Sequence, residues 1–208
     1  MSIAPKIALG ALSVGGIAGG GVLISQNLSK ETISDKLKGE GYTILTDDSH
    51  EEWNTVLTKF KEGSINLPKF SLTNQELKTL QSKCKEVLSK SNFDEDDYKK
   101  SKKWCVKPTS IKEVLGKRGI QSLNFETNSE RDKDSWIKMA TKYVIHGTGN
   151  KKIGNFTISP TPKDTGWSQL KAQCKTLIEK DSWWNSDFED ELTKAKLWCT
   201  KSSDYLAK

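Results

Sequence analysis

The sequence predicts a mainly α-helical protein: a tandem repeat of two small helical units, each with a disulfide-linked helical hairpin, behind an N-terminal apolar helix. Three observations lead to this fold class. Apolar side chains recur at helical spacing, the second part of the chain repeats the first, and four cysteines occupy matched positions in the two copies. We divide the 208 residues into an N-terminal transmembrane anchor or export signal (1–28), a first half (29–109) and a second half (110–208).

The N-terminal segment is apolar over residues 7–24 and carries no charge there. As a helix it would measure about 27 Å, close to the roughly 30 Å hydrocarbon core of a bilayer. Three interpretations compete: a retained membrane anchor, a cleaved export signal and a buried soluble helix. We favour the anchor over the cleaved signal because no good A-x-A cleavage site is present. The membrane is therefore an expected partner, through residues 7–24.

The two halves align with an offset that grows along the chain. Trp53 matches Trp136 at an offset of 83, and Cys84 matches Cys174 at an offset of 90. The dipeptide at 104–105 matches the one at 198–199, both Trp-Cys, at an offset of 94. Because the order never breaks, we interpret the chain as two copies of one unit.

Each half is predicted to contain the same helices. An apolar stripe at positions i, i+3, i+4 and i+7 runs from Trp53 to Phe60, and its counterpart runs from Trp136 to Tyr143. Two later stripes in each half carry the cysteines and form a helical hairpin. Capping-box spacing, a hydroxyl residue followed three positions later by Glu, marks expected helix starts at Ser49, Thr73, Ser110 and Ser186.

The cysteines form one pair in each half, at spacings of 21 and 25 residues. Neither spacing is C-x-x-C, which excludes the common zinc and thioredoxin-like motifs. In each predicted hairpin the first cysteine lies within one helix and the second ends the next helix at a similar level. Of the three possible connectivities we therefore favour the disulfides Cys84–Cys105 and Cys174–Cys199, with buried free thiols as the alternative.

No known catalytic or nucleotide-binding motif occurs in the sequence. The only histidines, His50 and His146, do not correspond between the halves. We therefore predict no enzymatic activity, no cofactor, no metal site and no small-molecule substrate. Lys and Arg outnumber Asp and Glu by 33 to 27, but only two of the cations are Arg and both signs are interspersed, so we also predict no nucleic-acid partner.

Three tryptophans occur in only one half: Trp167, Trp183 and Trp184. Residues matched in both halves are expected to serve the fold, whereas unmatched ones are freer to serve function. Trp183 and Trp184 fall at the bend of the second hairpin among polar residues, which is typical of exposed contact residues. We predict that these three bind a partner; the alternative is that one of the pair packs at the end of the hairpin.

Several features together resemble a known group of proteins. They are an M-S start, a Gly-rich apolar leader, a Lys-rich and Arg-poor body, and the motifs KKWC at 102–105 and KLWC at 196–199. In these respects the chain is similar to the expanded paralogous families of uncharacterised proteins in haemotropic mycoplasmas. The resemblance implies a wall-less bacterium and a membrane or surface location, and it carries no activity over to individual residues.

We thus expect a membrane-anchored or exported surface protein that presents a helical ectodomain for host contact or antigen exposure, without catalysis. It would lie in the cell membrane with its ectodomain outside, or be secreted if the leader is cleaved, and its partner would be a host protein or another surface protein. The alternative is an intracellular-facing helical adaptor that binds a partner protein through exposed aromatics.

Overall fold

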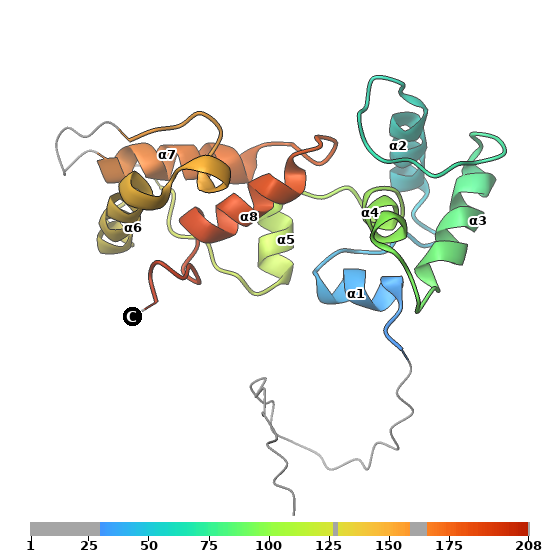
Figure 1. Ribbon diagram of the computed structural model, residues 1–208, viewed down its shortest axis with the longest axis horizontal. Coiled ribbons are helices and arrows are strands. Elements are labelled where there is room, and N and C mark those ends of the chain that lie inside the picture. The colour runs from blue at the N-terminus through green and yellow to red at the C-terminus, as the bar shows by residue number, and fades with distance from the viewer. Residues whose placement is uncertain (1–29, 127–128, 159–165, 208) are drawn as a thin grey trace, which may run out of the picture.

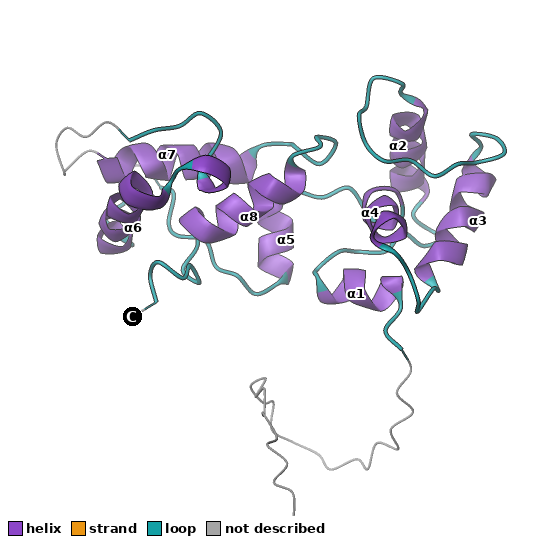
Figure 2. Cartoon of the chain, viewed as in Figure 1, coloured by secondary structure: helices purple, strands orange, loops and turns teal. Residues whose placement is uncertain are grey.

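The computed structural model describes residues 30–126, 129–158 and 166–207. Over these residues the chain forms eight α-helices, one short 3-10 helix and no strand (Figure 2), which confirms the prediction of a mainly helical protein. The predicted apolar helix over residues 7–24 lies outside the described residues, and none of the helices within them is long and apolar enough to cross a bilayer. The helices are α1 (Ile33–Gly39), α2 (His50–Lys61), α3 (Leu77–Leu88), α4 (Glu95–Trp104), α5 (Ile111–Lys117), α6 (Lys133–His146), η1 (Gly149–Lys151), α7 (Gly166–Glu179) and α8 (Phe188–Cys199).

The helices lie in two groups, α1 to α4 from the first half and α5 to α8 from the second (Figure 1). The chain passes between the groups through the segment that joins α4 to α5. In the first half, α3 packs against α4 and α1 contacts both helices. In the second half, α7 packs against α8 and α5 contacts both. The short first helix of each half thus covers the cysteine-bearing hairpin of the same half.

The predicted apolar stripes form the core. Complete burial of one such side chain contributes about 1.5–3 kcal/mol, so the periodic positions fix which face of each helix turns inward. The tryptophans that match between the halves are all buried, as expected for residues that serve the fold. The buried stripes are Trp53, Val56 and Phe60 on α2, and Trp136, Met139 and Tyr143 on α6.

Each buried indole N–H of the matched tryptophans donates to a backbone carbonyl outside its helix. This satisfies a polar group that would be costly to bury unpaired. Trp53 donates to Thr46 O at 2.9 Å and Trp136 to Asn124 O at 3.0 Å; Trp104 donates to Pro68 O at 2.6 Å and Trp198 to Lys151 O at 2.7 Å.

The end of each half pairs with the segment that follows its first helix. In the first half, the Leu45 N–H donates to Cys105 O at 3.0 Å, beside an isolated antiparallel bridge between Ile44 and Val106. In the second half, Leu123 N–H donates to Cys199 O at 2.9 Å, beside a bridge between Ser122 and Thr200. Each half is therefore closed by backbone hydrogen bonds next to its second cysteine.

Glycine ends the first helix of each half. Gly41 follows α1 with φ +83° and Gly119 follows α5 with φ +68°, the left-handed conformation of a helix C-terminal cap. A Cβ at position 41 would lie 3.3 Å from Arg118 Cγ and from Lys117 Cβ, whereas one at position 119 would meet no atom within 4 Å. Both positions therefore require a left-handed backbone, but only position 119 has room for a Cβ atom.

We predict that Gly119→Ala lowers the free energy of unfolding by about 1–2 kcal/mol, the strain of a left-handed alanine. Gly41→Ala should lower it further because the new methyl group meets the second half. Urea unfolding of the two variants followed by circular dichroism measures the difference. A loss at position 41 no larger than at position 119 would contradict this packing.

Candidate functional site

The cysteines form the two predicted disulfides. Cys84 on α3 is bonded to Cys105, the residue after α4, and Cys174 on α7 to Cys199, the last residue of α8. In both pairs the Cα atoms are 5.5 Å apart, and all four residues are buried. No free cysteine remains. The cysteines therefore link helices and offer no exposed thiol for chemistry.

Trp183 packs at the end of the second hairpin, in agreement with the alternative, and the prediction that its side chain is exposed is wrong. Its side chain is 1 % exposed and lies between the two halves, with its ring centroid 6.0 Å from Tyr42 and 4.9 Å from Phe188. The polar neighbours of Trp183 in the sequence suggested a solvated bend, but that bend is covered by the first half. Trp183 thus joins the two halves.

Trp184 and Trp167 are half-buried. Trp184 lies against Trp104 of the first half, at a ring-centroid distance of 5.7 Å. Trp167, near the start of α7, has the ammonium groups of Lys133 and Lys171 each 5.6 Å from its ring centroid. The three tryptophans therefore do not form one exposed surface. Trp183 is buried, and only parts of Trp184 and Trp167 reach solvent.

The last tryptophan of each half has a second aromatic neighbour. Phe60 and Tyr143 make matching edge contacts with Trp104 and Trp198, both at 4.9 Å. The further neighbour of Trp104 is Trp184, from the other half, whereas that of Trp198 is Tyr205, which stacks on it at 4.8 Å from the C-terminal segment.

A cavity of about 380 Å³ lies between the two halves. We call it the inter-half cavity. It combines apolar side chains with three lysines and two glutamates. Its lining residues are Leu67, Pro68, Glu95, Tyr98, Lys99, Lys102 and Lys103 from the first half and Asn185, Ser186, Phe188 and Glu189 from the second.

Lys103 is the most buried charged group in this cavity, with 8 % of its surface exposed. Its Nζ donates to the carbonyl of Trp183 and lies 4.1 Å from the centroid of that ring. Burial lowers the pKa of Lys103 to about 8, and the neighbouring charge of Lys102 acts in the same direction while Glu189 opposes it. Above pH 8 this amine is mostly neutral.

Glu189 connects the cavity to Tyr42. The Tyr42 hydroxyl donates to Glu189 Oε1 at 2.9 Å, and Lys102 forms an ion pair with Glu189 at 3.3 Å. Burial, and next the charge of Glu189, raise the pKa of Tyr42 above its usual value, so the phenol stays protonated at neutral pH. The contact between the halves is therefore polar as well as aromatic.

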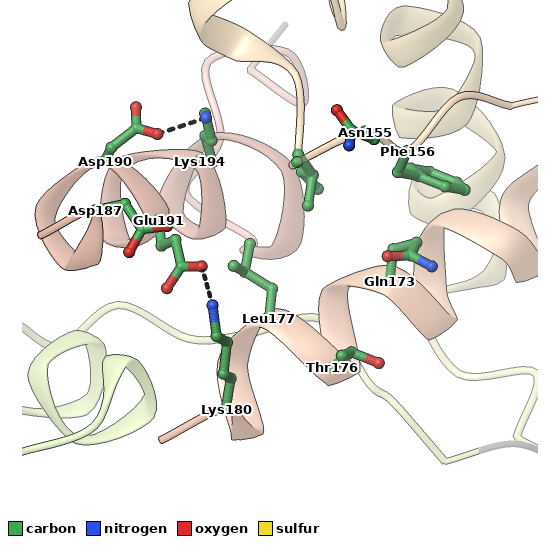
Figure 3. A pocket seen from close by; sticks show the side chains of 12 residues that line it. Asn155, Phe156, Gln173, Thr176, Leu177, Lys180, Asp187, Asp190, Glu191 and Lys194 are labelled. Carbon is green, nitrogen blue, oxygen red and sulfur yellow. Dashed lines mark hydrogen bonds and ion pairs between the residues drawn. The ribbon is translucent and has the colours of Figure 1, made fainter. Parts of the chain in front are cut away.

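A second, more open hollow of about 420 Å³ lies between α7, α8 and the segment 153–156, and we call it the α7–α8 groove. Figure 3 shows its polar side chains from both helices around Leu177. Lys180 pairs with Glu191 at 2.6 Å and Lys194 pairs with Asp190. The hydrogen bond to Glu191 raises the pKa of Lys180, so this lysine stays protonated at neutral pH.

Among the described residues, no group of three His, Cys, Asp or Glu side chains could hold a metal ion. His50 is exposed at the start of α2, and His146, at the end of α6, stacks on Tyr205 with ring centroids 5.2 Å apart. The two histidines belong to different halves.

Sequence reasoning missed one surface. In the described part of the chain, the exposed large hydrophobic residues are on α6: Ile137, Val144 and Ile145, at 39 %, 53 % and 62 % exposure. Their spacing i, i+7 and i+8 places them on one side of the helix, away from the buried stripe. The sequence contained the signal for this surface, because these three apolar residues fall outside the stripe from Trp136 to Tyr143.

Comparisons of this chain with protein-family models, with curated proteins and with solved structures found no match.

Proposed function

We propose that the chain is a surface protein, anchored in a membrane or exported by its N-terminal segment, that presents a helical ectodomain for host contact or antigen exposure. The observation that carries the proposal is the pair of disulfides at matched positions behind an uncharged apolar segment. The proposal assigns the chain no catalysis, and its partner would be a host protein or another surface protein.

The ectodomain in this proposal consists of two copies of one unit. Three matched features support it: disulfides with equal Cα separations, backbone pairing beside the second cysteine, and indole hydrogen bonds at corresponding tryptophans. The first helix of each half also starts with a capping box, Thr32 with Asp35 and Ser110 with Glu113. The offset between matched residues grows steadily from the start of the repeat to its end and never decreases.

The disulfides favour an extracellular location. Disulfides persist in oxidising compartments and are rare in the reducing cytosol. Each half has a small core, and a covalent link between its two cysteine-bearing helices stabilises such a core where no chaperone or reductant is present. The same links would not persist in a reducing cell interior, which counts against the intracellular adaptor.

The surface offered for contact in this proposal is the outer side of α6. Ile137, Val144 and Ile145 are exposed there, whereas the matched positions of the first half are Asn54, Lys61 and Glu62. Apolar residues that occur in one half only and remain exposed are suited to a protein contact.

Protease shaving of intact cells that produce the full chain tests this function. We expect trypsin to release peptides of residues 29–208, which mass spectrometry identifies, while a cytoplasmic marker stays intact. Permeabilised cells give the control for complete access. Release of these peptides only after permeabilisation would overturn the surface location and support the intracellular adaptor.

Thiol alkylation separates the two alternatives by a different property. In denaturant without reductant, all four cysteines of a surface protein should resist iodoacetamide, and reductant should make all four reactive. Four alkylated cysteines in the unreduced chain from cells would contradict the exported form.

A further inference from the structure

Lys103 lacks a carboxylate partner in the inter-half cavity. Of the three lysines there, Lys99 forms an ion pair with Glu95 at 2.7 Å, and Lys102 pairs with Glu40 and Glu189, each at 3.3 Å. Within the described residues Lys103 forms no ion pair, and its Nζ donates to the carbonyl of Trp183. An ammonium group has three N–H donors, and the carbonyl of Trp183 accepts from one of them. Lys103 can therefore donate to a further acceptor.

The α7–α8 groove gives the contrasting case. Its two lysines, Lys180 and Lys194, each have a carboxylate within ion-pair distance. Its lining adds a third carboxylate, Asp187, so its balance of charges is negative. The inter-half cavity has three lysines against two glutamates, and its buried Lys103 has no carboxylate within ion-pair distance among the described residues.

We propose that the inter-half cavity binds a small organic carboxylate, whose carboxylate accepts hydrogen bonds from Lys103 and whose apolar body contacts Leu67, Tyr98 and Phe188. The Lys103 Nζ lies 5.2 Å from the centroid of the Phe188 ring, so cation and apolar wall are adjacent. A volume of about 380 Å³ lies within the range of small-ligand sites, which are largely apolar with a few placed polar groups.

The charged side chains around Lys103 limit the ligand to one negative charge. Lys99 and Lys102 face the cavity from α4, together with Glu95, and Glu189 faces it from α8. The lining side chains sum to one positive charge when Lys103 is protonated, and Glu40, the second partner of Lys102, lies beside them, so a second negative charge on the ligand would be repelled. The bound anion would stabilise the protonated form, so binding requires the ammonium and weakens as pH rises past about 8.

Isothermal titration calorimetry with 3-phenylpropanoate on the full chain tests the proposal, and 3-phenylpropanamide serves as the uncharged control. At pH 7 we expect saturable binding of the acid anion and roughly tenfold or weaker binding of the amide, because the charge-assisted hydrogen bond is lost. Lys103→Met should weaken binding of the anion by a similar factor. Lys85→Met, which removes an exposed lysine of α3 that pairs with Asp47 and does not line this cavity, should leave it within about twofold.

The pH dependence tests the same site without a substitution. Affinity of the unaltered chain for 3-phenylpropanoate should fall steadily between pH 7 and pH 9.5, and the indole N–H signal of Trp183, assigned with Trp183→Phe, should shift on binding. Absence of saturable binding at pH 7, equal affinity for acid and amide, or affinity unchanged up to pH 9.5 would each overturn the proposal. These three results remain decisive if Lys103→Met fails to fold.

Discussion

Replacing Trp183 by alanine is expected to lower the free energy of unfolding by about 3–5 kcal/mol, the usual loss when a fully buried large aromatic is truncated. The indole is 1 % exposed and contacts Tyr42 and Phe188, while the Lys103 ammonium lies 4.1 Å from its ring centroid. Because Tyr42 and Phe188 belong to different halves, the cavity left by the substitution would open at their junction.

Urea unfolding followed by far-ultraviolet circular dichroism measures this loss. The control is Trp167→Ala, which removes an equally large side chain from a half-buried position near the start of α7. We expect the control to lose distinctly less stability. Equal losses in the two variants, or a loss below about 1 kcal/mol for Trp183→Ala, would contradict the placement of Trp183 between the halves.

Removal of one disulfide, by Cys84→Ala together with Cys105→Ala, should lower the free energy of unfolding by about 3 kcal/mol. The bond closes a loop over a sequence separation of 21 residues, and the cross-link restricts the unfolded chain. Replacing both cysteines avoids leaving a buried thiol without its partner. The equivalent change at Cys174 and Cys199, which span 25 residues, should have a similar effect.

Thermal melting with and without dithiothreitol checks the cysteine prediction. Reductant should lower the melting temperature of the unaltered chain and leave a variant without cysteines unchanged. The same melting temperature for the unaltered chain in both conditions would show that the disulfides do not stabilise it.

The helices and the disulfide pairing could be predicted because their signals are local or periodic. The stripe from Trp53 to Phe60 needs only a spacing of 3.6 residues, and the cysteines needed only a hairpin that brings neighbouring helices level. Helix starts were less predictable. The capping box at Ser110 forms, but the Ser49 hydroxyl accepts from Thr46 N–H instead of capping α2.

The other two expected starts are displaced. α3 begins after Glu76 and α8 after Asp187, so neither Thr73 nor Ser186 is the N-terminal cap. In both cases the residue pattern of a capping box is present without its hydrogen bonds. Tertiary packing of the stripes that follow decides where these helices begin, and a short pattern does not contain that information.

The site could not be predicted because its residues come from distant parts of the chain. Leu67, Lys103 and Phe188 are separated in sequence and meet only where the two halves are in contact. Trp183 was misjudged for the same reason: its neighbours in sequence are polar, and the side chains that bury it lie more than 70 residues earlier or on the following helix. Burial at a junction between helix groups is a property of the assembled fold.

The aromatic neighbours of Trp104 and Trp198 come from different halves of the chain. Trp104 of the first half packs against Trp184 of the second half, whereas Trp198 stacks on Tyr205, which belongs to the same half. If the chain were divided at residue 110, the C-terminal piece would keep the contact between Trp198 and Tyr205, and the N-terminal piece would lose the contact between Trp104 and Trp184. The C-terminal piece would in turn expose Trp183, whose ring packs against Tyr42 of the first half, so neither piece keeps all of its aromatic contacts.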